Sequence, residues 1–213
     1  MSGNGPTALG FRQAAPADAA AAVPLIYSSG PAAFDYVFVV DGHATAQEFL
    51  RRAFVDGAGE FGWRNHWVGE LDGEVVAVGA GYGGESSLAF MLAAARQILA
   101  HYGPRYAPGV IMRGLRVERV IPPPERRLHY LAHLGVVPAL RGQGIGRQLI
   151  EYLVAQGRVQ GKQRLVLDVA VGNPRAQALY ERLGFRVTAE RRSQLARDQA
   201  AVPDHRRMER ALD

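Results

Sequence analysis

A basic, glycine-rich turn in the second half of the chain has the residue types of an anion-binding site. Arg141 and Arg147 bracket Gly142, Gly144 and Gly146. Glycines carry no side chain, so the backbone N–H groups of such a turn can close on an anion. The turn leads into a segment with apolar residues at helical spacing, and a helix N-terminus favours negative charge. The sequence therefore predicts a phosphate-binding turn.

Two common phosphate-binding motifs do not fit this turn. A P-loop ends in Gly-Lys-Ser or Gly-Lys-Thr, which is missing here, and the dinucleotide fingerprint needs a third glycine where Arg147 stands. The pattern that remains is Arg-x-x-Gly-x-Gly, formed by Arg141, Gly144 and Gly146.

That pattern follows Leu-Gly-Val-Val-Pro at 134–138 and resembles the coenzyme-A loop of the GNAT superfamily of acyl-coenzyme-A N-acyltransferases. The stretch 173–185, NPRAQALYERLGF, is similar to the second signature of that family, and a weaker similarity covers the strand pair at 70–76. The two signatures stand in the right order, separated by one helix and one strand. The resemblance covers the last third of the chain.

The resemblance implies an acetyl-coenzyme A site. In the family the fourth and fifth strands splay apart and expose backbone groups to the pantetheine arm. Leu134 and Val136 would offer these groups, with the Val136 N–H stabilising the oxyanion, and Gly135 would mark a bulge in the strand. The implied cofactor-binding residues are Leu134, Gly135, Val136, Arg141, Gly142, Gln143, Gly144, Ile145, Gly146, Arg147, Asn173 and Tyr180.

Two residues of the second signature have both a functional and a structural interpretation. Tyr180 falls where the family often places the acid that protonates the departing thiolate, and a phenol is neutral at pH 7. A tyrosine on an amphipathic helix is otherwise a core residue. Asn173 is expected to cap its helix, a role that is compatible with cofactor contact.

The general base is less defined. The fourth strand carries His129 and His133 and no carboxylate. Two-residue alternation places both histidines on one face of the sheet, and histidine suits proton removal near neutral pH. Both histidines could instead have structural roles. The general base would then be Glu118 or Glu125, which precede the strand, or a chain of water molecules. The six histidines show no ligand spacing, so no metal site is predicted.

Composition bounds the class of protein. The 213 residues, 48% of them hydrophobic, suffice for one domain over 1–213 with an insertion at 85–127 and frayed residues 1–8. Cysteine is absent, which excludes a cysteine nucleophile and a disulfide framework. No apolar run is long enough to span a membrane, and a cytoplasmic location is expected.

The positive charge is concentrated around the turn. Residues 141–213 hold 14 of the 25 basic residues and 8 of the 20 acidic residues. Coenzyme A is a polyanion, so its binding would account for this excess of positive charge. Nucleic-acid binding would favour a stripe of basic and aromatic residues, but aromatic residues are only 8% of the chain. Arginine doublets at 191–192 and 206–207 are expected to be solvated, with ribose phosphate binding as the alternative.

The expected fold is α/β (α+β) and GNAT-like. It has a mixed, mainly antiparallel twisted sheet of six to seven strands, helices on both faces, and parallel, splayed fourth and fifth strands. Segment 34–40 is either a strand or a packed loop. The expected strands are 9–13, 65–71, 74–82, 129–137, 164–171, 185–188 and 205–212, and the expected helices are 16–27, 46–55, 88–101, 144–160 and one from Pro174 to Gly184.

Local signals support three of these elements. Thr45 is an N-cap, Asp72-Gly73 is a hairpin turn, and Leu88, Leu92, Ala95 and Leu99 share one face of helix 88–101.

The predicted function is N-acetyl transfer from acetyl-coenzyme A to a primary amine of a small molecule, by direct attack in a ternary complex. Neither nucleic acid nor a membrane is an expected partner, and a homodimer is compatible with the sequence. The alternatives are a protein lysine or N-terminal acetyltransferase and a non-catalytic coenzyme-A sensor. The acceptor pocket is expected from segments 34–62 and 85–127, with Asp35, Asp41, Glu60 and Glu85 as partners for a cationic amine.

Overall fold

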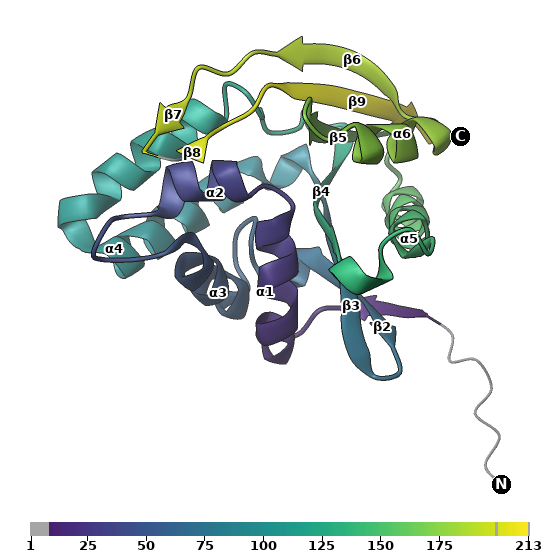
Figure 1. Ribbon diagram of the computed structural model, residues 1–213, viewed down its shortest axis with the longest axis horizontal. Coiled ribbons are helices and arrows are strands. Elements are labelled where there is room, and N and C mark those ends of the chain that lie inside the picture. Colours follow the sequence, from purple (N-terminus) through teal and green to yellow (C-terminus); the bar gives the residue numbers. More distant parts are fainter. Residues whose placement is uncertain (1–8, 199, 213) are drawn as a thin grey trace, which may run out of the picture.

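A seven-stranded sheet organises the molecule, with strand order β1-β2-β3-β4-β5-β9-β6 (Figure 1). The computed structural model describes residues 9–198 and 200–212, so the segment expected to fray, 1–8, lies outside the described residues. Only β4 and β5 are parallel. The strands are β1 Gly10–Gln13, β2 His66–Leu71, β3 Glu74–Gly83, β4 Leu128–Val136, β5 Arg164–Ala170, β6 Arg186–Arg191 and β9 His205–Ala211, with a separate ribbon of β7 Ala196–Arg197 and β8 Ala200–Ala201.

Helices cover both faces of the sheet, which confirms the predicted fold class (Figure 1). Helices α5 and α6 pack on one face, and α1 to α4 lie on the other. The helices are α1 Ala19–Ser28, α2 Pro31–Phe38, α3 Ala46–Asp56, α4 Ser87–Val117, α5 Ile145–Val159 and α6 Pro174–Arg182, with the short turns η1 Pro16–Asp18, η2 Trp63–Asn65, η3 Gly84–Ser86 and η4 Pro138–Leu140.

Local signals set several boundaries as predicted. Thr45 accepts a hydrogen bond from the Glu48 N–H, and the Glu48 carboxylate accepts from the Thr45 N–H, which closes a capping box on α3. The β2–β3 hairpin turns through Asp72 and Gly73, at φ 54° and 81°. Both values lie in the left-handed region that a two-residue hairpin of this type requires.

Segment 34–40 was expected to be a strand or a packed loop, but residues 34–38 are helical because they belong to α2, which ends at Phe38. Pro31 opens the helix at a position where its missing N–H costs nothing. Tyr36, Val37 and Phe38 are buried in a cluster with α3 and α4. Tertiary burial, which periodicity in a short apolar run does not reveal, therefore decides the conformation.

The expected insertion forms a broken helix. Gly103, at φ 67°, interrupts α4 and is followed by Pro104 and Pro108. The predicted helix 88–101 corresponds to the part of α4 before this break. Leu88, Leu92 and Leu99 do share a face of that half, but they are 63%, 61% and 53% exposed.

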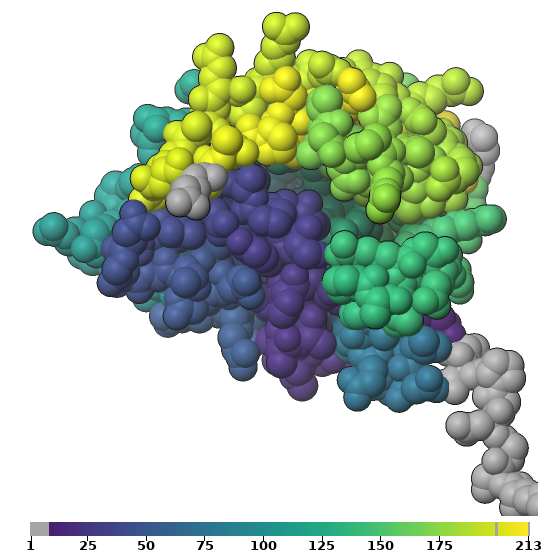
Figure 2. Space-filling view, in the orientation of Figure 1, coloured from purple at the N-terminus to yellow at the C-terminus, as the bar shows by residue number. Residues whose placement is uncertain are grey.

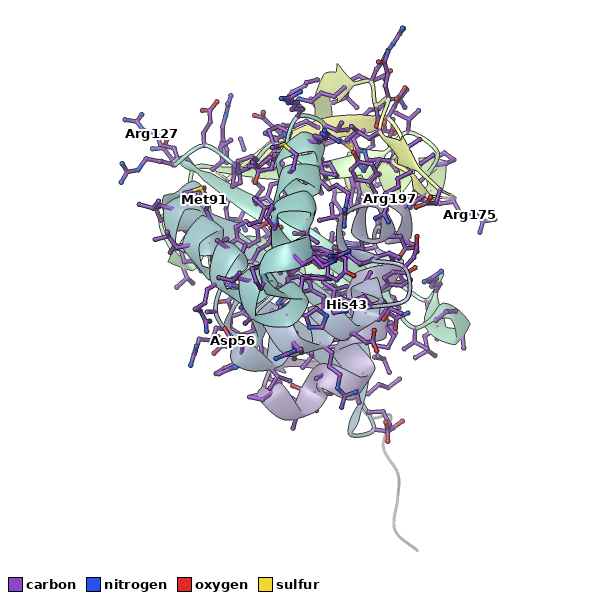
Figure 3. The ribbon with its side chains drawn as sticks, turned by 90° about the vertical axis from the view of Figure 1, so that its left-hand side faces the viewer. His43, Asp56, Met91, Arg127, Arg175 and Arg197 are labelled. Carbon is purple, nitrogen blue, oxygen red and sulfur yellow. The ribbon has the colours of Figure 1, made fainter. Side chains whose placement is uncertain are left out.

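The buried side of the first half of α4 carries Gln97 and Ile98 instead. Asp56 at the end of α3 accepts hydrogen bonds from Arg96 and Gln97 of α4. Figure 3 labels Asp56 and also Met91, which lies on the outer side of α4. The insertion is thus attached to α3 by polar contacts.

The parallel pair separates after three residue pairs. Strand β4 pairs with β5 only from Leu128 to Tyr130, opposite Arg164 to Val166. Beyond this point β5 pairs on its other side with β9, and β4 pairs on its other side with β3. The predicted splay of the fourth and fifth strands is therefore present, and it begins after Tyr130.

The predicted bulge in β4 is present, but it lies at the two residues directly before Gly135. His133 and Leu134 both stand opposite Gly79, whereas Gly135 pairs regularly with Val78. Gly135 has a different reason to be glycine. A Cβ atom there would lie 2.5 Å from the Leu25 carbonyl oxygen, because α1 crosses β4 in close contact.

We expect Gly135→Ala to lower the free energy of unfolding by about 1–3 kcal/mol, the usual cost of overpacking. Gly172→Ala is the matched control, since a Cβ atom at Gly172 meets nothing within 4 Å, and it should change stability by less than about 0.5 kcal/mol. Urea unfolding of both variants measures the difference. Equal stabilities would contradict the close packing of α1 on β4.

Candidate active site

The predicted phosphate turn presents free backbone donors to solvent. Gly142 and Gly144 adopt φ 82° and 85°, values that favour glycine. The N–H groups of residues 142–147 donate no hydrogen bond within residues 9–198 and 200–212. Because these groups also form the N-terminus of α5, they are available to bind an anion.

Two arginines flank the turn in different ways. The Arg141 Nε donates to the Val136 carbonyl oxygen at 3.0 Å and thereby ties the turn to the end of β4. The Arg147 Nε donates to Glu151 one turn along α5 at 2.8 Å. Arg147 also lines a cleft of about 550 Å³ between α5 and α6, together with Arg158, Arg182 and Arg210. The basic surface therefore extends beyond the turn.

The edge of β4 offers main-chain donors to the gap left by β5. The Val137 N–H donates to the Val76 carbonyl oxygen at 2.9 Å. Successive N–H groups of a strand point to opposite sides, so the Val136 N–H points away from β3 and toward the gap. The Leu134 side chain packs on the α5 side of the sheet. Figure 2 shows the surface hollowed between α1–α2 and the yellow-green C-terminal strands.

Tyr180 and Asn173 occupy the positions expected on α6. Asn173 caps the helix by accepting a hydrogen bond from the Ala176 N–H at 3.1 Å. The Tyr180 ring is 9% exposed and packs edge-on against Phe185. Burial raises the pKa of Tyr180 to about 12, so the phenol is protonated at neutral pH. Tyr180 therefore belongs to the core and also carries a proton.

His129 and His133 do not share a face, which corrects the prediction. His133 is itself part of the bulge, with φ 55°, so the two-residue alternation stops at Ala132 and the two side chains lie on opposite sides of the sheet. His129 lies beside Gly157 of α5, and within the described residues neither of its ring nitrogens has a hydrogen-bond partner. Burial lowers the pKa of His129 to about 4. His129 is thus a neutral core residue away from His133.

His133 lies on the face covered by α1 to α4. Its ring packs near Phe34 and Phe61, with centroids 6.0 and 5.2 Å apart. Its Nδ1 lies 3.0 Å from the Nε2 of His66, and its Nε2 lies 3.6 Å from Glu60 Oε1. Burial, and to a lesser extent His66, lowers the pKa of His133 well below its usual value. The ring is therefore neutral in this environment.

Glu60 faces His133 from the loop between α3 and β2. Tyr82 on β3 donates to Glu60 Oε1 at 2.7 Å. Enclosure by protein raises the pKa of Glu60, the charge of Glu118 raises it further, and the bond from Tyr82 opposes both. Solvent still reaches 41% of the Glu60 side chain. This carboxylate, suggested by the sequence only as a partner for an amine, lies at an accessible position beside His133.

A second polar cluster lies where β4 and β5 separate. The sequence analysis did not predict it. Tyr130 on β4 donates to Asp168 Oδ2 on β5 at 2.9 Å. Arg207 on β9 donates to the same oxygen at 2.7 Å and to Asp168 Oδ1 at 3.2 Å. The side chains of Asp168 and Arg207 are only 1% and 9% exposed. A charged residue inside the apolar run 164–170 was the available signal.

The arginine doublet 206–207 is consequently not a pair of solvated charges. Arg207 also donates to the Pro122 carbonyl, and Arg206 donates to Glu190 and Gln177, each at 2.8 Å. In the part of the chain that the structure describes, no cluster of His, Asp or Glu has the geometry of a metal site, and no helix has the length and apolar character of a membrane span.

Sequence comparisons place these residues among acetyltransferases. Residues 40–185 match a family model described as the acetyltransferase (GNAT) family. A 5-NmdU N-acetyltransferase of Pseudomonas phage PaMx11 is 40% identical over 67 residues, which are 32% of this chain and 44% of that protein. A ribosomal protein bS18-alanine N-acetyltransferase of Escherichia coli strain K12 is 40% identical over 63 residues, 30% of this chain and 43% of that protein. The chain spans less than half the length of these curated relatives.

Solved structures share the fold along the whole chain. An N-acetyltransferase from Staphylococcus aureus Mu50 has a TM-score of 0.67 at 17% identity and covers 94% of this chain and 100% of its own. A putative acetyltransferase from Salmonella typhimurium, solved with its cofactor acetyl-CoA, has a TM-score of 0.54 at 20% identity and covers 97% of this chain and 95% of its own.

The buried ion pair at the base of the gap predicts a large stability effect. Asp168→Asn leaves the buried Arg207 charge without its partner and should lower the free energy of unfolding by about 3–5 kcal/mol. Glu151→Gln breaks the exposed pair with Arg147 and should cost about 0–1 kcal/mol. Chemical denaturation of the two variants compares them. If Asp168→Asn changed the free energy of unfolding only slightly, the ion pair would not be needed to stabilise the fold.

Proposed function

The chain belongs to the GNAT acetyltransferase family, and on that premise we propose that it is an N-acetyltransferase that moves the acetyl group of acetyl-CoA to a primary amine. The observation that carries the proposal is the row of free N–H groups at 142–147, next to the gap between β4 and β5. A diphosphate at the turn and an extended arm along the edge of β4 would satisfy both sets of donors.

In this proposal the turn binds the pyrophosphate of acetyl-CoA, and the pantetheine arm continues along β4. A structural neighbour of this fold was solved with acetyl-CoA, which supports the choice of cosubstrate. The Val136 N–H stabilises the oxyanion that forms when the amine attacks the thioester. Attack is direct, because the chain contains no cysteine to carry the acyl group.

Tyr180 is the proposed proton donor for the departing thiolate. Its phenol is protonated at neutral pH and lies on α6, which follows the fifth strand. A neutral donor beside the sulfur stabilises the charge that develops there. The proton that the amine loses on forming the amide balances the proton that the sulfur gains.

The acceptor is proposed to be a small molecule. Phe34 of α2 and Phe61 pack around His133 and narrow the approach to the site. A protein N-terminus is the second candidate, since relatives include a ribosomal-protein alanine N-acetyltransferase and an N-alpha-acetyltransferase 30 of Schizosaccharomyces pombe, 41% identical over 56 residues, 26% of this chain and 37% of that protein. A cytoplasmic location and a homodimer stay predictions.

Release of free thiol from acetyl-CoA tests the function directly. The panel contains small primary amines, lysine peptides and peptides with free N-termini. We expect thiol release with small amines. Release with peptides alone would assign a protein acetyltransferase instead, and tight binding of coenzyme A without turnover of any acceptor would assign a sensor.

We expect Tyr180→Phe to lower kcat about a hundredfold, within the range for a lost general acid, and to leave the KM for acetyl-CoA unchanged. Tyr152→Phe is the matched control, because Tyr152 lies on α5 and packs against Phe11 and Trp67. Steady-state kinetics of both variants decides the assignment. An unchanged kcat in Tyr180→Phe would mean that another group protonates the sulfur.

A further inference from the structure

A hydrogen-bond chain fixes which nitrogen of His133 carries its proton. The Gly62 carbonyl oxygen lies 2.9 Å from His66 Nδ1. A carbonyl only accepts, so His66 Nδ1 carries a proton and, in the neutral ring, His66 Nε2 carries a lone pair. That lone pair lies 3.0 Å from His133 Nδ1, which must therefore be the donor. The remaining nitrogen of His133, Nε2, is left with a lone pair.

An unusual backbone conformation holds the His133 ring on the side of the sheet where Glu60 lies. His133 has φ 55°, a left-handed conformation that is unusual for a residue other than glycine. The conformation belongs to the bulge opposite Gly79 and turns the ring to the α1–α4 side. Strain of this kind persists only where the surroundings impose it, and it is typical of functional sites.

The lone pair of His133 Nε2 and the carboxylate of Glu60 face one another without a donor between them. They are 3.6 Å apart, which is too far for a direct hydrogen bond. The hydroxyl proton of Tyr82 is already directed at Glu60. Within the described residues, no lysine or arginine lies within 4.0 Å of Glu60. These two acceptors, of which the Glu60 side chain is 41% exposed, therefore lack a cationic donor.

We propose that the acceptor amine binds as its ammonium between Glu60 and His133 Nε2, that His133 removes the proton, and that His66 is the positioning residue that keeps Nε2 free. The inference rests on the proposed acetyl transfer and names the substrate class as cationic primary amines. One N–H bond of the ammonium breaks and its proton goes to Nε2. The freed electron pair forms the new bond to the thioester carbon, the C–S bond breaks, and its electron pair leaves on the sulfur. Tyr180 protonates that sulfur, the amine's second proton replaces the proton of Tyr180, and His133 returns its proton to solvent.

The position of His133 along β4 agrees with this role. It lies just beyond Tyr130, the last β4 residue that pairs with β5, and so at the start of the gap proposed for the thioester arm. The imidazolium formed by proton transfer would lie between the Glu60 carboxylate and the acceptor nitrogen of His66. The carboxylate of Glu60, 3.6 Å from His133 Nε2, stabilises that cation.

Few other titratable groups face this nitrogen. His66 comes from β2, Tyr82 from β3, Glu60 from the loop before η2, and Glu118 acts on Glu60 from the end of α4. From α2 the neighbour is Phe34. A pH profile of the reaction therefore reports on the Glu60–His133 pair.

Kinetic variants separate binding from proton removal. His133→Gln should lower kcat about a hundredfold or more, as for a lost general base, with the KM for acetyl-CoA unchanged. Glu60→Gln should mainly raise the KM for the amine. Glu74→Gln, at an exposed position of the β2–β3 hairpin, is the control and should leave both parameters and the pH profile unchanged. A kcat that survives His133→Gln would overturn the inference.

Two variants of His66 test its positioning role. His66→Gln keeps an oxygen acceptor for His133 Nδ1 and should retain most of the activity. His66→Leu removes the acceptor, so we expect a kcat at least tenfold lower and an altered acid limb of the pH profile. Thermal unfolding shows whether each variant is folded. Equal activity of the two folded variants would refute the role of His66.

The tautomer can be observed without turnover. Histidine ¹⁵N NMR of the whole chain should show the His133 proton on Nδ1, and n-butylammonium should perturb the His133 signals in the wild type but not in Glu60→Gln. The neutral n-butanol is the matched probe and should have no effect. A proton on Nε2 would overturn the inference. Absence of thiol release from the wild type with every amine would instead refute the proposed function.

Discussion

The parting of β4 from β5 is the constraint on which the site depends. Three pairs of residues join the strands, and the Tyr130–Asp168 hydrogen bond then bridges the point where they separate. Arg207 fixes Asp168 from β9, the strand that takes over the other edge of β5. Beyond this bridge, main-chain groups on the β4 edge lack a neighbouring strand, and groups of that kind need a partner. A ligand with a peptide-like arm can provide it.

The bulge in β4 decides which side of the sheet His133 faces. With regular alternation, His133 would face the α5 side of the sheet, as His129 does. With the bulge, His133 turns to the face where Glu60 and His66 lie. One backbone irregularity therefore selects between two histidines that look equivalent in the sequence.

Features encoded by neighbouring residues could be predicted from the sequence. The capping box at Thr45, the Asp72-Gly73 hairpin and the glycine turn before α5 depend on local chemistry alone. The helix α2, the side on which His133 lies and the Asp168–Arg207 pair could not be predicted in this way. They depend on the register of β3 against β4 and on burial between distant segments, which a single sequence does not display.

The polar residues across the sheet form two groups with different electrostatics, in contact through the rings of Tyr82 and Tyr130, whose centroids are 5.6 Å apart. In one group the charge of Asp168 is balanced by Arg207, so that group is complete and serves as a structural tie. In the other, Glu60 and His133 present acceptors, and no arginine or lysine of the described residues pairs with Glu60. Burying uncompensated acceptors is costly, and the group remains open to solvent at Glu60. The proposed ammonium of the substrate would supply the missing cation.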